Sequence, residues 1–168
     1  MLTDTDPYTV ARRLAAEIVD DTTADVLAEV LPAGATVCVV GWADLIGDAL
    51  LKRDDVAVLV VGSDDRADFL TSSVLAADLV LIEALAASSS EMLAAPGARA
   101  AASVAYCSEI PVWAVVGAGR RIPGVGFRSL VDRVPAERVA DVVPLGLCSE
   151  VAPNDGDCPI ALELTRGY

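Results

Sequence analysis

The segment GAGRR holds the residues of this sequence that are best suited to binding a phosphate. It begins at Gly117, directly after the apolar stretch PVWAVV, and ends with Arg120 and Arg121. Gly117 and Gly119 would let a ligand approach the backbone, and each arginine could grip a phosphate with two parallel hydrogen bonds. A dinucleotide-binding loop needs GxGxxG at the start of a helix, and here Pro123-Gly124 is expected to end any helix. A surface turn with solvated arginines is the simpler alternative.

Two further glycines stand where a ligand could approach a strand end or a helix start. Gly97 and Arg99 stand at the start of the stretch GARAAASVAYC, and the free N–H groups of a helix start favour an anion. An ordinary helix start remains the alternative there. Gly41 follows the apolar stretch TVCVV, and Trp42 comes next. Trp42 could stack on a ligand, but we favour a role in anchoring a dimer contact.

Glu83 is the candidate for proton transfer. It follows the apolar stretch LVLI, where burial would raise the pKa of a carboxyl group and prepare it for general acid or base catalysis. It could equally accept hydrogen bonds from the loop at residues 88–90, or face solvent. The sequence contains no histidine, which excludes Ser-His and Cys-His nucleophile pairs.

The four cysteines do not predict a metal site. Cys38, Cys107, Cys148 and Cys158 show no CxxC spacing, and a zinc site would need all four thiolates or help from carboxylates. Cys38 and Cys107 lie in apolar segments and are expected in the core as small side chains. Cys148 and Cys158 flank an Asn-Asp-Gly turn, but a disulfide between them is disfavoured in the cytosol. We expect neither a metal nor a cofactor.

Length, composition and charge favour one globular domain with few classes of partner. The chain has 168 residues, of which 54% are hydrophobic and 4% aromatic, so Ala, Val and Leu must form its core. A net charge of -13 would repel the phosphates of a nucleic acid. No apolar run reaches the ~20 residues that a membrane helix needs, and the first ten residues do not resemble a signal peptide. We therefore expect a cytoplasmic protein without nucleic-acid or membrane partners.

Short apolar strands alternate with helical stretches along most of the chain. Strands are expected at residues 35–40, 56–61, 78–83 and 110–116. Helices are expected at residues 8–20, 24–31, 43–53, 69–75, 98–108 and 135–143, and residues 84–95 could be a loop or a broken helix. This alternation predicts an α/β fold with a Rossmann-like parallel sheet flanked by helices. Residues 1–32 are expected to be a helical N-terminal appendage, and residues 33–168 the domain.

The predicted sheet places the candidate residues at one edge. Ligands of open α/β sheets bind outside the carboxyl ends of the strands. The strand ends at Gly41, Glu83 and Gly117 and the helix start at Gly97 are expected to meet there. This edge is therefore the predicted ligand site.

Four stretches of the sequence, in their order along the chain, resemble the C-terminal Rossmann-like half of the translation initiation factor 2B alpha/beta/delta-type family. That family includes methylthioribose-1-phosphate isomerase and ribose-1,5-bisphosphate isomerase. The stretches are LPAGATVCVVGWADLIGDALLK, ADLVLIEALAA, PGARAAASVAYCSEIPVWAVVGAG and LVDRVPAERVADVVP, which together span about residues 31–145. The resemblance implies the fold and the family's habit of dimerising through this domain.

The residues that carry the family's isomerase chemistry are mostly replaced. The isomerases use an Asp in a segment GADR, which here reads EALA from Glu83. The family's Asn-Lys pair, which holds the sugar phosphate, falls on Ala94-Ala95, and Gly97 persists from that motif. The catalytic Cys of the isomerases lies in an upstream region that has no counterpart here, and Cys38 is expected within a strand rather than on a loop. The resemblance therefore does not imply isomerase activity.

Three functions remain open from the sequence. The first is a non-catalytic binding or regulatory domain, homodimeric, that recognises a phosphorylated sugar or nucleotide at the strand-end edge. The second is a small aldose–ketose sugar-phosphate isomerase with Glu83 in place of the missing Asp. The third is a structural protein-interaction module.

Overall fold

The computed structural model describes residues 21–41, 43–62, 65–122, 124–133 and 140–152. Most of the expected N-terminal appendage, including the helix at residues 8–20, lies outside these ranges. So do Trp42, Cys158 and most of the helix expected at residues 135–143. No helix of the described residues is long and apolar enough to cross a membrane.

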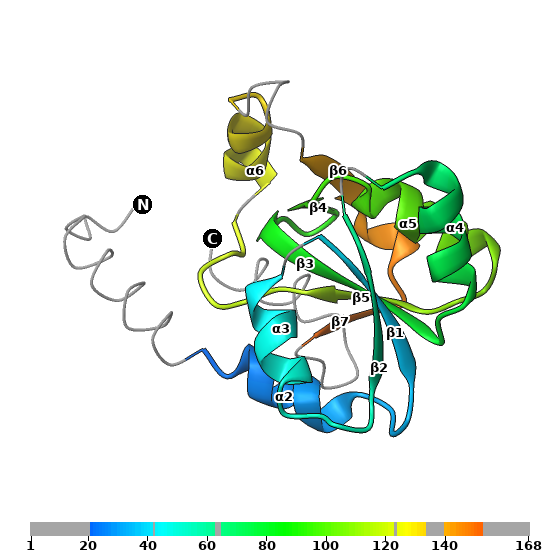
Figure 1. Ribbon diagram of the computed structural model, residues 1–168. Coiled ribbons are helices and arrows are strands. Elements are labelled where there is room, and N and C mark those ends of the chain that lie inside the picture. The colour runs from blue at the N-terminus through cyan, green and yellow to red at the C-terminus, as the bar shows by residue number, and fades with distance from the viewer. Residues whose placement is uncertain (1–20, 42, 63–64, 123, 134–139, 153–168) are drawn as a thin grey trace.

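Five parallel strands form the centre of the structure in the spatial order β2-β1-β3-β5-β7 (Figure 1). Their bounds are β1 Thr36–Val40, β2 Ala57–Val61, β3 Leu79–Ala87, β5 Val112–Val115 and β7 Glu150–Ala152. The four strands expected from the sequence, β1, β2, β3 and β5, are confirmed to within a few residues. The sequence did not predict β7. The continuous apolar character of β1, β3 and β5 follows from burial on both faces, as is typical of parallel strands covered by helices, whereas most residues of the edge strand β2 are exposed.

Strand β3 is longer than its sequence predicted and belongs to three ladders. Its first half pairs with β1 and β5 in parallel, and its second half pairs antiparallel with β4 (Glu91–Ala94). β4 in turn pairs antiparallel with β6 (Asp141–Pro144). The sheet is therefore mixed: the predicted parallel strands are present, and antiparallel pairing of β3, β4 and β6 extends the sheet beyond them. The loop or broken helix expected at residues 84–95 is a β-hairpin, and residues 141–143 lie in a strand rather than in the expected helix.

A serine closes the unexpected hairpin between β3 and β4. The Ser88 hydroxyl accepts hydrogen bonds from the backbone N–H groups of Ser90 (3.3 Å) and Glu91 (3.0 Å). The backbone N–H of Ser88 donates to the carbonyl of Glu91 at 2.8 Å. Serine side chains stabilise turns in this way. The alanines of the second half of β3 have a weak β propensity that the ladder with β4 overrides.

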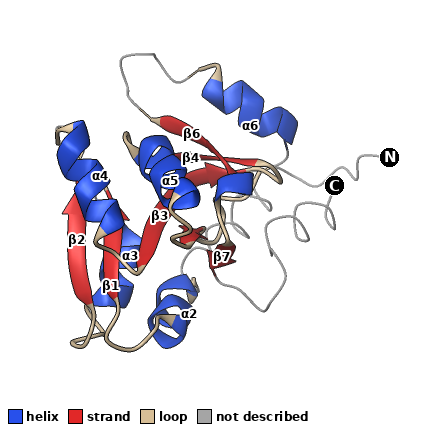
Figure 2. Cartoon of the chain, turned by 90° about the vertical axis from the view of Figure 1, so that its right-hand side faces the viewer, coloured by secondary structure: helices blue, strands red, loops and turns tan. Residues whose placement is uncertain are grey.

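Helices cover both faces of the parallel part of the sheet (Figure 2). On one face lie α2 (Thr23–Val30) and α3 (Asp44–Leu50), with Leu27 and Ile46 fully buried. On the other lie α4 (Ala67–Leu75) and α5 (Ala98–Cys107), whose inner face consists of four buried alanines. These small side chains let α5 approach the sheet closely. The helical spacing of the apolar residues predicted which face of each helix packs on the sheet.

A further helix, α6 (Gly124–Val131), packs on the antiparallel extension of the sheet. Phe127 of α6 is buried against Ala86 of β3 and Leu93 of β4. The sequence predicted that Pro123-Gly124 would end a helix, and this is wrong because α6 begins at Gly124. A short 3₁₀ turn, η1 (Leu145–Leu147), connects β6 to β7.

An ion pair fixes the carboxyl end of α2. Arg53 donates from Nη1 to the carbonyl oxygens of Ala28 (2.7 Å) and Leu31 (2.8 Å), two acceptors that the helix leaves unpaired. Its guanidinium also makes two hydrogen bonds to the Asp55 carboxylate, of 2.7 and 2.8 Å. These bonds, together with one from the Gly34 N–H, hold the pKa of Asp55 well below its usual range.

The cysteines differ from one another in exposure. Cys38 is fully buried in β1, as expected, and burial raises the pKa of its thiol to about 11. Cys107 is exposed at the end of α5, so the prediction of a core position is wrong. It lies one residue beyond Tyr106, on the outward side of the last helical turn, whereas Ala105 faces the sheet.

Candidate functional site

The carboxyl ends of β1, β3 and β5 meet at one edge of the sheet, as predicted. Glu83 lies in β3 where the parallel ladder with β5 ends, paired with Val115. Gly41 follows β1, and Gly117 stands two residues beyond β5. The chain continues from β1 to β2, which pairs with one side of β1, whereas the next strand, β3, pairs with the other side. In open α/β sheets such a reversal of strand order marks the crevice where ligands bind.

Glu83 is buried, and other parts of the chain occupy both oxygens of its carboxylate. Its side chain is 8% exposed. Oε2 accepts a hydrogen bond of 3.1 Å from the backbone N–H of Ile46, in the first turn of α3. Oε1 accepts one of 2.6 Å from Nη1 of Arg120. Residue Ala43, which precedes α3, has no side chain that could cap the helix, so Glu83 supplies the missing acceptor from a neighbouring strand.

Arg120 is fixed by both its side chain and its backbone. Besides Glu83, Nη1 donates to the carbonyl of Ala84 at 2.9 Å. The carbonyl of Arg120 accepts a hydrogen bond of 2.8 Å from the N–H of Ala87, and the N–H of Ile122 donates to the carbonyl of Ala87 at 2.8 Å. The segment after Gly119 therefore extends the pairing of β3, and Gly119 itself turns the chain with a φ of 75°. The arginine side chain is 28% exposed, so water still reaches it.

The loop after β5 is held by an aspartate from the start of α2. Asp21 accepts hydrogen bonds from the backbone N–H groups of Ala118 (2.8 Å) and Thr23 (2.9 Å). Burial alone would raise the pKa of Asp21, but these hydrogen bonds and the nearby Arg120 charge outweigh it and lower the pKa. A Cβ at Gly117 would lie 2.6 Å from Cδ1 of Leu45 and 2.7 Å from Oδ2 of Asp21. Glycine is therefore needed here for packing.

A second group forms where β1 and α5 meet. Gly41 has a φ of 74°, and a Cβ there would lie 2.5 Å from that of Ala95. Gly97 has a φ of 89° and lies next to Val40 and Leu70. Each glycine therefore turns the chain in a conformation that other residues rarely adopt. The two turns predicted as ligand approaches instead pack against the protein.

The start of α5, predicted as an anion site, also carries an internal carboxylate. The backbone N–H of Arg99 donates to Oδ2 of Asp141, in β6, at 3.0 Å. Arg99 is otherwise exposed, and Arg121 is partly buried beside the end of β3.

Three carboxylates of the chain thus bind three of the backbone donors that an anionic ligand would need. Asp21 binds the loop after β5, Glu83 the start of α3, and Asp141 the start of α5. The sequence identified Glu83 but not the other two as parts of the edge. Among the residues described, no group of three or more metal-ligating side chains comes together.

No protein-family model and no curated protein sequence matches this chain. Solved structures do. The eIF2B beta subunit from Chaetomium thermophilum is 15% identical over 82% of this chain, with a TM-score of 0.63. A chain of the tetrameric eIF2B-beta2-delta2 complex from the same organism is 16% identical over 85%, with a TM-score of 0.64. The initiation factor eIF-2B delta subunit from A. fulgidus is 15% identical over 84%, with a TM-score of 0.52.

The chain has the eIF2B-like fold. The resemblance seen in the sequence is therefore confirmed at the level of the fold. The chain matches 49%, 57% and 58% of those three structures' own lengths, so it spans about half of each eIF2B subunit.

Proposed function

We propose that this chain is a non-catalytic binding domain of the eIF2B-like family that acts as a homodimer. The observation that carries the loss of catalysis is the pairing of Glu83. A general acid or base needs an oxygen within hydrogen-bond reach of its substrate. Both oxygens of Glu83 bind groups of the chain, the Ile46 N–H and the Arg120 guanidinium.

The three cysteines of the described residues are free thiols, which supports a reducing compartment such as the cytoplasm.

The outer edge of β2 supports the homodimer. No described strand pairs with this edge, and the sequence of β2, AVLVV, carries no charge that would discourage pairing. Val58 and Val60 are 41% and 55% exposed, and Leu51, which follows α3, is 87% exposed. A hollow of about 630 Å³ lies between α3 and Val58, and Asp44 and Asp48 line it together with Leu50 and Leu51. A second copy would pair with the edge strand and cover the exposed Val58, Val60 and Leu51.

Sedimentation equilibrium tests the dimer. The wild-type chain is expected at twice its 17.3 kDa. Val60→Lys places a charge on the edge and should yield monomers, since its side chain is already half exposed and the fold can accept lysine. Val125→Lys, on the exposed face of α6, is the matched control and should remain dimeric. A monomeric wild type, or a dimeric Val60→Lys, would contradict the proposed interface.

Recognition of a phosphorylated sugar or nucleotide is the second candidate function. The partial exposure of Arg120 favours it, because a phosphate could reach the guanidinium. Such a ligand would have to draw Arg120 away from Glu83 and approach Asp21, within a chain of net charge -13.

A thermal-shift screen of sugar phosphates and nucleotides separates the two functions. A bound ligand raises the unfolding temperature by mass action. A domain that binds none of these compounds should therefore keep the same unfolding temperature throughout the screen. Stabilisation of the wild type that is lost in Arg120→Ala would replace our proposal with phosphate recognition. Turnover of an aldose phosphate by the wild type would establish an isomerase instead.

A further inference from the structure

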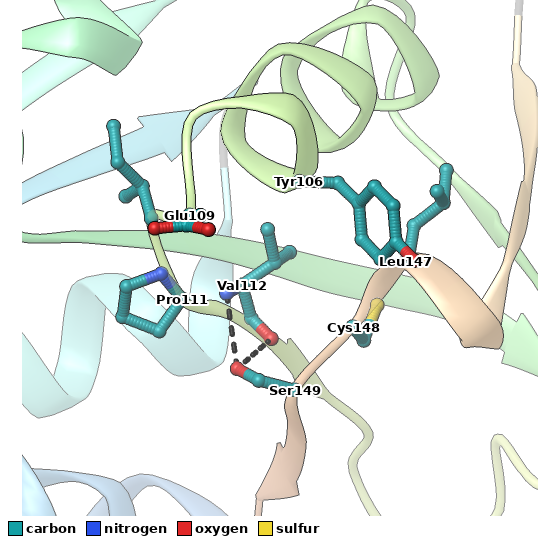
Figure 3. Close-up of a pocket in the computed structure, with 8 residues that line it drawn as sticks. Tyr106, Glu109, Pro111, Val112, Leu147, Cys148 and Ser149 are labelled. Carbon is teal, nitrogen blue, oxygen red and sulfur yellow. Dashed lines mark hydrogen bonds between the residues drawn. The ribbon is translucent and has the colours of Figure 1, made fainter.

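A cavity of about 310 Å³ lies at the edge of the sheet opposite Glu83 and Gly117. The last turn of α5, the first residues of β5 and the segment between η1 and β7 form its walls (Figure 3). Its volume is at the lower end of the range for small-molecule sites. Nothing in the proposed dimer or the strand-end edge uses it.

Most of the surface that lines the cavity is apolar. Ile110, Pro111, Val112 and Leu147 line it. The Ser149 hydroxyl accepts from the N–H of Val112 and donates to its carbonyl, both at 3.1 Å, so its hydrogen-bonding capacity serves the wall. Glu109 is the charged side chain of the lining, and the Tyr106 ring, 61% exposed, is its aromatic surface.

Glu109 occupies this position in a strained backbone conformation. The N–H of Ile110 donates to the carbonyl of Ala105 (2.9 Å), and that of Glu109 donates to the carbonyl of Tyr106 (3.3 Å). These two bonds form a Schellman turn, in which glycine is the usual residue at the left-handed position. Glu109 holds that position with a φ of 57°. Strain of this kind gathers at functional sites, and here it places a carboxylate beside an apolar cavity.

We propose that this cavity binds an organic cation, an ammonium or guanidinium group attached to an apolar body. The cationic head pairs with the exposed Glu109 carboxylate at one end of the cavity. The apolar body extends across Pro111 and Val112 and contacts Leu147 and the Tyr106 ring at the other end. Figure 3 shows Tyr106 and Glu109 on opposite sides of Val112, at the two ends of the cavity.

The charge of the chain favours a cation over other ligands at this place. The net charge of -13 favours the approach of cations over that of anions. The lining contributes no positive side chain that would already neutralise Glu109. The ligand can be a free amine or the side chain of a lysine or arginine in another protein, because both present the same chemistry.

An NMR titration of the whole chain tests the proposal. The probes are phenethylammonium as a free amine, N-acetyl-lysine methylamide as a side-chain mimic, and 2-phenylethanol as the neutral counterpart of the first. Amide shifts are expected at residues 106–110, 112 and 147–149 with a cationic probe. Binding of phenethylammonium alone indicates a small-molecule ligand, and binding of the lysine mimic as well indicates a protein side chain.

Variants and salt decide whether charge and ring carry the binding. Glu109→Gln should weaken phenethylammonium binding about five-fold through loss of the charge pair, and Tyr106→Leu about five-fold through loss of the ring contact with the apolar body; added salt should weaken binding to the wild type. Glu29→Gln, at an exposed position of α2, is the matched control and should bind as the wild type does. Equal binding of 2-phenylethanol, insensitivity to both Glu109→Gln and salt, or no shift with either cation overturns the proposal.

Discussion

Replacement of Glu83 by glutamine should destabilise the fold, whatever its effect on activity. Glutamine keeps one carbonyl oxygen, which can accept from the Ile46 N–H or from Arg120 but not from both as the carboxylate does. Its amide group then faces a second donor. Arg120 would keep the carbonyl of Ala84 as its described acceptor.

The size of the effect follows from the two bonds. A hydrogen bond to a charged group contributes about 1.5–3 kcal/mol, and a helix cap about 0.5–2 kcal/mol. Breaking a fully buried ion pair costs about 3–5 kcal/mol, but Arg120 is 28% exposed and water can partly solvate it. We therefore expect Glu83→Gln to lower the free energy of unfolding by about 3 kcal/mol, and the melting temperature by roughly 9 °C for a domain of this size.

Urea unfolding of a double-mutant cycle measures this. Glu83→Gln, Arg120→Met and the double variant should show a coupling energy of about 1–2 kcal/mol, and Glu29→Gln should be neutral. A loss below about 0.5 kcal/mol in Glu83→Gln, with no coupling to Arg120, would refute the role assigned to the pair. The expected instability also means that loss of turnover in Glu83→Gln could not by itself demonstrate catalysis.

Three further changes test the backbone and the charge network. Gly41→Ala should lower the free energy of unfolding by about 3 kcal/mol, because the new Cβ collides with Ala95 in addition to straining the backbone. Gly34→Ala is the control: its φ is 68° but there is open space around it, so it should lose only about 1 kcal/mol. Urea unfolding measures both. Glu109→Gly should gain about 1 kcal/mol and roughly 3 °C in melting temperature, since it relaxes the left-handed residue; a loss of stability would show that the turn is not strained. The pKa of Asp55 is lowered in the folded state, so its contribution to stability is complete above about pH 4 and is lost as the pH falls toward its folded value. Asp55→Asn should therefore flatten the acid limb of the stability profile, and an unchanged limb would contradict the assignment.

The sequence predicted the parallel part of the fold because local patterns determine it. The continuous apolar stretches of β1 and β2 and the spacing of alanines in α5 each signal their own element. The hairpin after Glu83 carried no such signal, since its alanines favour helix over strand and its turn depends on one hydroxyl, that of Ser88.

The candidate edge was predicted in place but not in chemistry. Glu83, Gly117 and Arg120 do meet, as strand order required. Their partners could not be foreseen: Asp21 contacts Ala118 across 97 positions of the sequence, and Asp141 contacts Arg99 across 42. A pairing of this range depends on the tertiary structure and leaves no periodic trace.

The three internal carboxylates have a consequence for how the domain behaves as conditions change. A protein whose helix starts are completed by a bound metabolite gains stability only while that metabolite is abundant. Asp21, Glu83 and Asp141 are tethered to the backbone donors they bind, so their effective concentration is constant. These three donors therefore stay paired whatever the concentration of an anionic ligand, and the stability that they contribute should not depend on its supply.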